Sequence, residues 1–286
     1  MIINPLSNDK KLCEFVKECI IKGYSNHKVP KKIVIQIIKV LEHKNLSYIF
    51  HSIGKIVKHN LFRNARKKYE KNRIRHRTIW KYIKNEIPKN STILDVGCGK
   101  GDIGFVILTN RRIKKYIGSD IRLNFYTKRR KSEKIKFIQQ PSETVIPIPN
   151  HSIDVILMID LLHHVKPEIQ LKLLKHVKNK LKPNGKIIIF EYTFSQIIKP
   201  MINNLIYKKF KELTLYQKLT YLMVMDWISN VLILKRKIPM PYAFRTFEEW
   251  KKIFKDVGYS IVKSKYIGFP EEFFHQGPYC LFILKH

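Results

Sequence analysis

The sequence predicts an α/β fold built on a doubly wound, mostly parallel sheet with helices on both faces. Two observations lead to this prediction. From residue 91 onward, short apolar segments of strand length alternate with helical segments, a rhythm typical of parallel sheets. A glycine-rich stretch directly follows the first of these strands, at the edge of the sheet where such folds bind ligands.

The first 60 or so residues predict helices that each have one apolar face. Apolar residues recur at helical spacing in residues 9–24, 30–44 and 47–59. Gly23 is expected to end the first helix, and Pro30 suits the first turn of the second. In the third, Ile49, Phe50 and Ile53 share the apolar face. Such helices must pack on each other, on the next domain or on a partner protein.

A basic segment follows at residues 63–77, with eight Lys or Arg and one acid. It is either a solvated helix face or linker, or a surface that follows phosphates. A second basic stretch at 127–136 favours the phosphate interpretation. The candidate polyanion-binding residues are Arg63, Arg66, Lys67, Lys68, Arg73, Arg75 and Arg77.

Strands are expected at residues 92–96, 114–120, 134–139, 152–159 and 185–192, with a clear helix at 167–181. Residues 195–240 interrupt this pattern and are helical. Their apolar run, 219–234, is shorter than the ~20 residues that a transmembrane helix needs, so a lid or an interfacial helix is expected instead. A capping box of Thr246 and Glu249 then predicts a helix, before two last strands at 260–268 and 278–285.

The chain carries 56 Lys and Arg against 22 acids, for a formal charge of +34. Ala65 and Ala243 are the only alanines, which indicates an AT-rich genome that would enrich lysine. That bias does not explain the shortage of acids, so part of the charge is interpreted as functional. Such a field attracts nucleic acid or an anionic membrane surface.

The four cysteines, Cys13, Cys19, Cys98 and Cys280, form no CxxC pair. We therefore expect no metal site and no disulfide framework, and a reducing, cytoplasmic location. The first ten residues turn polar too soon for a signal peptide.

The glycines have the spacing Asp95-x-Gly97-x-Gly99-x-Gly101. Glycine permits a sharp turn with positive φ and lets a ligand approach the backbone. Asp120 ends the second strand, where a carboxylate can accept hydrogen bonds from ribose hydroxyls. An acid inside the loop suits an ammonium group better than a phosphate. The pattern therefore predicts a site for a nucleoside that carries positive charge.

Four stretches, LDVGCGKG, GSD, DVILMIDLLHHV and LKPNGKIII, resemble the motifs of class I S-adenosylmethionine-dependent methyltransferases. The resemblance runs from about Ser91 to Tyr192, and the last helix and two strands complete the family's layout. It implies a seven-stranded Rossmann-like sheet, S-adenosylmethionine as cofactor, and methyl transfer. It does not name the acceptor.

Roles carry over from the resemblance by position. Asp95, Gly97 and Gly99 would line the methionine part of the cofactor, with Gly101 in the same loop, and Asp120 would hold the ribose. The third motif departs from the family pattern, because Pro141 stands where an adenine-binding acid is common. The candidates for the adenine side are then Ser142 and Glu143.

The expected domains are a basic helical extension over 1–75 and a methyltransferase domain over 76–286, with a helical lid at about 195–245. His163 and His164 follow the fourth strand. One of them is a candidate base, needed only if the acceptor must lose a proton. The alternative is that a histidine here merely caps or packs.

Three functions stay open. The shortage of acids and the N-terminal helices favour RNA as the acceptor, and we lean slightly to it. The lid favours a small hydrophobic acceptor, a lipid or a quinone, methylated at an anionic membrane that the protein contacts peripherally. A binding subunit without catalysis, with a partner protein on the N-terminal helices, is the third. No motif for amino methylation of adenine or cytosine follows the fourth strand.

Overall fold

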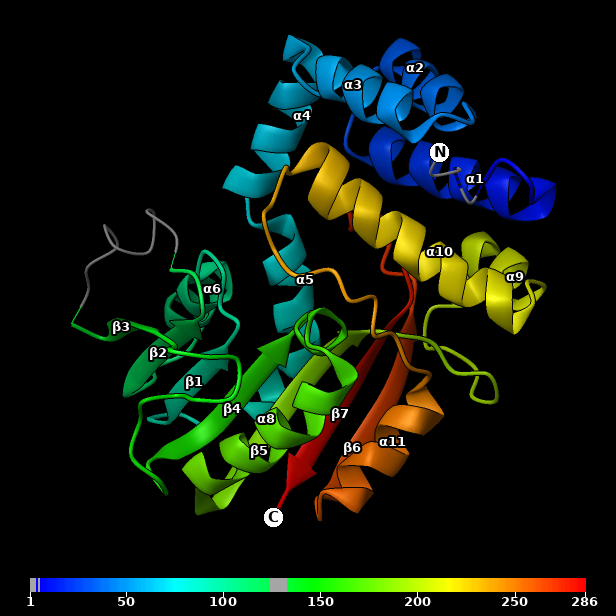
Figure 1. Ribbon diagram of the computed structural model, residues 1–286. Coiled ribbons are helices and arrows are strands. Elements are labelled where there is room, and N and C mark those ends of the chain that lie inside the picture. Colours follow the sequence, from blue (N-terminus) through cyan, green and yellow to red (C-terminus); the bar gives the residue numbers. More distant parts are fainter. Residues whose placement is uncertain (1–3, 5, 124–132) are drawn as a thin grey trace. The chain divides into compact units, whose positions relative to one another are not determined.

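Seven strands form one sheet in the computed structural model, which describes residue 4, residues 6–123 and residues 133–286 (Figure 1). The strand order is β3-β2-β1-β4-β5-β7-β6. The pairs from β3 to β5 are parallel, whereas β7 runs antiparallel to β5. The predicted doubly wound, mostly parallel seven-stranded sheet is therefore confirmed.

The strands are β1 (Thr92–Val96), β2 (Lys115–Asp120), β3 (Ile135–Gln139), β4 (Ile153–Ile159), β5 (Leu181–Tyr192), β6 (Ser260–Gly268) and β7 (Tyr279–Lys285). The first helices are α1 (Lys10–Asn26), α2 (Lys31–Leu41), α3 (Leu46–Ile56), α4 (Asn60–Lys71), α5 (Ile74–Ile83) and α6 (Asp102–Asn110). The later ones are α8 (Pro167–Lys180), α9 (Leu205–Lys211), α10 (Leu215–Trp227) and α11 (Phe247–Asp256). Short 3-10 turns are η1 (Lys84–Glu86) and η2 (Leu162–His164), and η3 (Ile228–Ile233) is a π-helix.

The chain forms two compact units. The sheet unit comprises His76–Pro200, Pro239–Ile267 and Tyr279–His286, and the helical unit comprises Met1–Arg75, Met201–Ile238 and Gly268–Pro278. The predicted domains, 1–75 and 76–286, remain a prediction. In the structure, the unit that holds the N-terminal helices also takes in two later segments.

The sheet unit has its core along the central strands β1, β4 and β5. Val155–Met158 on β4 and Ile187–Phe190 on β5 are fully buried, because parallel strands between two helical layers have no solvent-facing side. The register aligns Leu94 with Ile156 and Ile156 with Ile187. These are the apolar runs that the sequence predicted to be strands.

Parallel strands end together at one edge of this sheet. Val96 on β1 pairs with Ser119 on β2 and with Met158 on β4. Ile159 in turn pairs with Phe190 on β5. The residues that follow these pairs are the glycine loop, Asp120, the residues before η2 and Glu191, so the sheet brings all of them to its carboxyl edge.

The helical unit has an aromatic core drawn from all three of its segments. The ring of Phe15 on α1 lies 5.8 Å from Phe210 on α9, 4.8 Å from Tyr221 on α10 and 6.4 Å from Phe269. Tyr24 on α1 likewise packs 4.7 Å from Phe274. The predicted apolar face of α1 is therefore buried against residues distant in sequence.

Two predictions about the N-terminal helices are wrong. The first helix does not end at Gly23 but continues to Asn26. A Cβ at Gly23 would lie 2.3 Å from the carbonyl oxygen of Phe274, so this glycine permits close packing rather than termination. Phe50 is exposed, although the periodicity placed it on the apolar face of α3; Ile49 and Ile53 are buried there.

One further local prediction, the start of the last helix, is confirmed. Thr246 and Glu249 form the capping box that begins α11. The basic segment 63–77 lies on two helices, α4 and α5, separated at Arg73, whose φ is +48°. Residues 127–132 of the second basic stretch lie outside the described residues.

Among the helices that the structure describes, none is both long and apolar enough to cross a bilayer.

Candidate cofactor and acceptor site

The glycine loop joins the end of β1 to the start of α6. Gly97, Gly99 and Gly101 have φ values of +70°, +53° and +70°, which disfavour any residue with a Cβ. Gly101 is also hemmed in, since a Cβ there would lie 2.6 Å from the ring of Phe137. A Cβ on Gly99 would meet nothing within 4 Å. Gly99 is thus the loop position that faces open space.

The loop is fastened to the end of β2. The amides of Gly97 and Cys98 both donate to the carbonyl oxygen of Ser119, at 2.8 and 3.0 Å. The amide of Gly99 donates to Oδ2 of Asp120 at 2.9 Å. Oδ1 of Asp120 accepts from the amide of Arg122 at 2.9 Å. Each carboxylate oxygen retains capacity for a further hydrogen bond, so Asp120 can accept from vicinal hydroxyl groups.

A cavity of about 820 Å³ adjoins this strand end. Ile121, the residue after Asp120, lines it together with Pro141, Ser142 and Glu143. Ser142 and Glu143, the two residues predicted for the adenine side, thus line one cavity. This cavity adjoins Asp120, the residue predicted to bind the ribose. Apolar and polar side chains that converge in a concave site are typical of small-molecule binding.

Asp95 lies deeper than the resemblance implied. Its side chain is buried, and its Oδ2 accepts a hydrogen bond from the Tyr116 hydroxyl. Burial raises the pKa of Asp95 to about 7, although the bond from Tyr116 acts to lower it. Asp95 therefore supports the base of the loop, and its contact with the methionine part of a cofactor remains a prediction.

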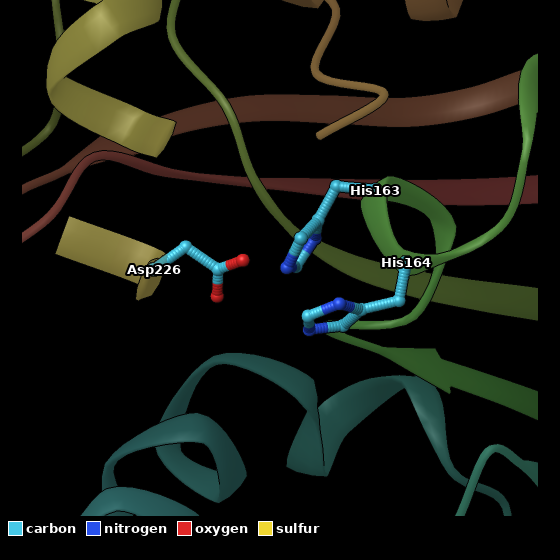
Figure 2. Close-up of side chains that lie close together, drawn as sticks. All are labelled: His163, His164 and Asp226. Carbon is cyan, nitrogen blue, oxygen red and sulfur yellow. The ribbon is translucent and has the colours of Figure 1, made fainter. Parts of the chain in front are cut away.

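Beyond β4, the turn η2 carries the two candidate histidines. Their rings lie side by side, with centroids 4.1 Å apart (Figure 2). His163 is buried and its Nδ1 lies 2.5 Å from Oε1 of Glu191, whereas His164 is half-buried and its Nδ1 lies 3.1 Å from the carbonyl oxygen of Pro239. The ring of Phe244 stacks on His163 at 5.1 Å. The two rings thus have different electrostatic surroundings.

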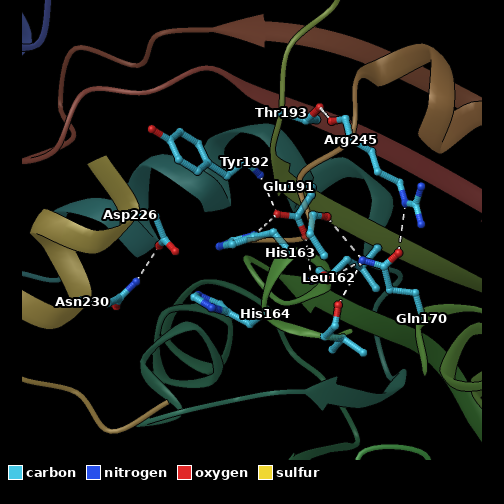
Figure 3. A network of polar contacts seen from close by, with 12 residues as sticks. Leu162, His163, His164, Gln170, Glu191, Tyr192, Thr193, Asp226, Asn230 and Arg245 are labelled. Carbon is cyan, nitrogen blue, oxygen red and sulfur yellow. Dashed lines mark hydrogen bonds and ion pairs between the residues drawn. The ribbon is translucent and has the colours of Figure 1, made fainter. Parts of the chain in front are cut away.

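Glu191 was not predicted from the sequence as a site residue. It is fully buried near the end of β5, and it accepts hydrogen bonds from three groups: Nδ1 of His163 and the amides of Leu162 and Tyr192 (Figure 3). The two amide bonds measure 2.8 Å each. The one available signal was an acid inside the apolar run GKIIIFEY, because a buried acid needs partners.

A second buried residue, Gln170, also holds η2 in place. The side-chain amide of Gln170 on α8 donates to the carbonyl oxygens of Leu162, Val165 and Ala243, at 2.9, 3.2 and 3.4 Å. Its oxygen accepts from Nε of Arg245 at 3.0 Å. Figure 3 shows Gln170 between η2 and Arg245. The turn that carries His163 is therefore fixed through side chains as well as backbone.

Comparison with known proteins agrees with this geometry. A family described as a methyltransferase domain matches residues 58–264, well over half of the chain. The chain belongs to the class I S-adenosylmethionine-dependent methyltransferase superfamily. As a member, it takes S-adenosylmethionine as its cofactor.

Solved structures show the same fold for this methyltransferase-family chain. A chain from the complex of the Haloferax volcanii Trm112 methyltransferase activator with its methyltransferase partner is 13% identical, with a TM-score of 0.52, over 82% of this chain and 98% of that one. The Burkholderia thailandensis 1,6-didemethyltoxoflavin-N1-methyltransferase, solved with 1,6-didemethyltoxoflavin and S-adenosylhomocysteine, is 15% identical, with a TM-score of 0.50, over 73% and 76%. Comparison with curated proteins gives no sequence match.

The residues present fit the family's cofactor. Gly99 leaves room at the loop, the Asp120 carboxylate can accept from two ribose hydroxyls, and the cavity beside it holds Ser142 and Glu143. Which atoms of the cofactor each residue contacts remains a prediction.

The predicted polyanion-binding residues do not form one uniform surface. Arg66 is engaged inside the helical unit, since its Nη1 donates to the carbonyl oxygen of Ile233 at 3.1 Å and its Nε pairs with Glu70 at 3.4 Å. The guanidinium of Arg75 lies 5.4 Å from the ring centroid of Phe273. Arg73 is half-buried. The exposed members are Arg63, Lys67 and Lys68 on α4 and Arg77 on α5.

Proposed function

We propose that this chain is an active S-adenosylmethionine-dependent methyltransferase that removes a proton from its acceptor with His163. The observation that carries the proposal is the buried pair of His163 and Glu191 at the carboxyl edge of the sheet. The bound cofactor supplies an activated methyl group, and the protein supplies alignment and a proton acceptor.

The partner of Nδ1 decides which nitrogen of His163 can act as the base. A carboxylate only accepts hydrogen bonds, so Nδ1 of His163 carries the proton toward Glu191. Nε2 then holds the lone pair of the neutral ring and can take a proton. The negative charge of Glu191 stabilises the imidazolium that results. His164 has a backbone carbonyl at Nδ1 instead, which offers no full charge for this purpose.

This chemistry selects the acceptor. A base is useful only where the accepting oxygen or nitrogen must lose a proton, so the acceptor is a hydroxyl or a weakly acidic N–H. RNA is one candidate acceptor, supported by the charge of +34 and by Arg63, Lys67 and Lys68, all exposed on α4. A small hydrophobic molecule or lipid that carries such a group is the other.

The experiment is transfer of a labelled methyl group from the cofactor to total cellular RNA and, separately, to a lipid extract. Wild-type protein is compared with His163→Asn and with Asp120→Ala as the variant impaired in cofactor binding. We expect His163→Asn to bind the cofactor normally but to transfer label about 100-fold to 10,000-fold more slowly. Undiminished transfer by His163→Asn would show that the base lies elsewhere.

The remaining outcomes assign the acceptor and separate enzyme from binding subunit. Label in RNA supports the RNA acceptor, and transfer should then fall steeply with salt. The variant Arg63→Gln/Lys67→Gln/Lys68→Gln should transfer more slowly, and the control Lys172→Gln/Lys175→Gln on α8 should not. Label in the organic phase identifies a lipid or other apolar acceptor. Failure to bind the cofactor at all would favour a binding subunit.

A further inference from the structure

Exposed apolar side chains gather in the segment around α9 and the start of α10. Within the helical unit, Met201, Leu205, Leu215 and Tyr216 are 56%, 65%, 45% and 75% exposed. The residue Ile197, shortly before them in the chain, is 84% exposed. Single exposed apolar residues are common, whereas several of them on neighbouring elements of one unit are a candidate interaction surface.

The same segment is strongly basic. Residues 196–218 contain one acid, Glu212, and the lysines are Lys199, Lys208, Lys209, Lys211 and Lys218. Of these, Lys209 is paired with Glu18 at 2.5 Å, whereas Lys208 and Lys211 are exposed. Exposed apolar and cationic side chains are therefore interspersed along the same short stretch of sequence.

Lys11 adds a further charge at the turn between α9 and α10. Its Nζ donates to the carbonyl oxygen of Glu212 at 2.7 Å. The Nζ of Lys218 lies 5.7 Å from the ring centroid of Phe210. Burial and the charges of Lys11 and Lys211 lower the pKa of Lys218. The ammonium groups of Lys11 and Lys211 thus repel that of Lys218, and a bound anion would offset this repulsion.

We call this the α9–α10 surface: Met201, Leu205, Leu215 and Tyr216 with Lys11, Lys208, Lys211 and Lys218. Of the polyanions that the charge could attract, RNA would use the lysines but leave the aliphatic side chains in water. An anionic lipid surface uses both kinds, because phosphates lie beside acyl chains at the headgroup boundary.

We propose that the α9–α10 surface docks the protein on anionic membranes, with the apolar side chains entering the headgroup boundary and the lysines facing lipid phosphates. Tyrosine suits that boundary, since its ring is apolar and its hydroxyl polar. The contact that we propose is a peripheral one. It does not depend on methyl transfer, so its test is separate from that of the proposed function.

The test is co-sedimentation of the full chain with vesicles of phosphatidylcholine alone, or mixed in equal parts with phosphatidylglycerol. We expect binding to the mixed vesicles only, weakened by added salt. Lys211→Gln/Lys218→Gln should reduce the partition coefficient by about 10-fold or more, since each lysine near such a surface contributes about fivefold. Leu205→Ser/Tyr216→Ser should reduce it comparably while keeping every charge.

Matched controls are Lys172→Gln/Lys175→Gln and Leu171→Ser, all at exposed positions on α8. Circular dichroism and cofactor affinity in solution confirm that each variant is folded. The proposal fails if wild-type protein ignores the mixed vesicles, or if the α8 variants lose as much binding as the α9–α10 variants. It also fails if Leu205→Ser/Tyr216→Ser binds normally while the lysine variant loses affinity for single-stranded RNA, which would make the surface an RNA site.

Discussion

The Tyr116 hydroxyl donates a hydrogen bond to Oδ2 of Asp95, and both side chains are buried beneath the glycine loop. This pair makes Asp95 an acid whose protonation is linked to folding. Burial raises its folded-state pKa to about 7, whereas an unfolded Asp has a pKa near ~3.9. The folded protein therefore keeps a proton that the unfolded chain releases between these values.

The first prediction follows from that linkage. The stability that Asp95 contributes is fully present below about pH 4 and is lost as the pH rises to about 7. We expect the free energy of unfolding of wild type, relative to Asp95→Asn, to fall by at most about 4 kcal/mol across this range. Chemical denaturation at several pH values measures it. A difference between wild type and Asp95→Asn that stays constant over this range would contradict the prediction.

Glycine substitutions in the loop should separate stability from cofactor binding. Gly101→Ala combines a positive φ with a clash against Phe137, and should cost about 3 kcal/mol of stability. Gly99→Ala has the positive φ but no clash, and should cost only about 1 kcal/mol. Its Cβ would project where the cofactor is expected, so affinity for S-adenosylmethionine should fall more than stability. Thermal unfolding and calorimetric titration test both; equal stability losses would count against the geometry.

Gln170 should act as a positioning residue for His163. Gln170→Leu removes a side-chain donor from three buried carbonyl oxygens, of which that of Leu162 keeps the amide of Val165, and should cost about 3 kcal/mol of stability. For methyl transfer, kcat should fall while KM changes less, because the substitution displaces η2 and with it His163. Gln170→Glu keeps an oxygen for Arg245 but not the donors, so it should resemble Gln170→Leu. If Gln170→Glu restored full stability, the contact with Arg245 rather than the carbonyls would be decisive.

The capping box of α11 gives a local test. Thr246→Ala removes the hydroxyl that accepts from the amide of Glu249, and should lower the free energy of unfolding by about 1 kcal/mol. Thr246→Ser keeps the hydroxyl and should lose much less. Urea denaturation of the two variants decides this, and equal losses would mean that the methyl group, not the cap, matters.

Local patterns sufficed for much of the fold. The strand 260–268 and the cap at Thr246 could be read directly, because hydrophobic runs and capping chemistry are properties of neighbouring residues. Gly23 was misread for the opposite reason. Its role is set by Phe274, some 250 residues later, and nothing beside it in the chain shows that packing.

The candidate site divides in the same way. The glycine loop and Asp120 could be predicted because one short motif holds them. Glu191 could not be assigned to His163, since they meet only through the parallel register of β4 and β5. Gln170 was missed because the sequence around it has the pattern of an ordinary amphipathic helix. Only the structure shows that its side chain is buried and bonded to η2.

The interleaving of the two units bears on how the chain matures on the ribosome. The chain passes from one unit to the other after Arg75, Pro200, Ile238, Ile267 and Pro278. Phe15 and Tyr24 emerge early, yet their partners Phe269 and Phe274 follow some 250 residues later, which takes roughly 10 to 50 s of translation. Until then the aromatic face of α1 lacks part of its core, so the nascent chain is a natural client for chaperones. A chain truncated at residue 267 would lack the last segments of both units.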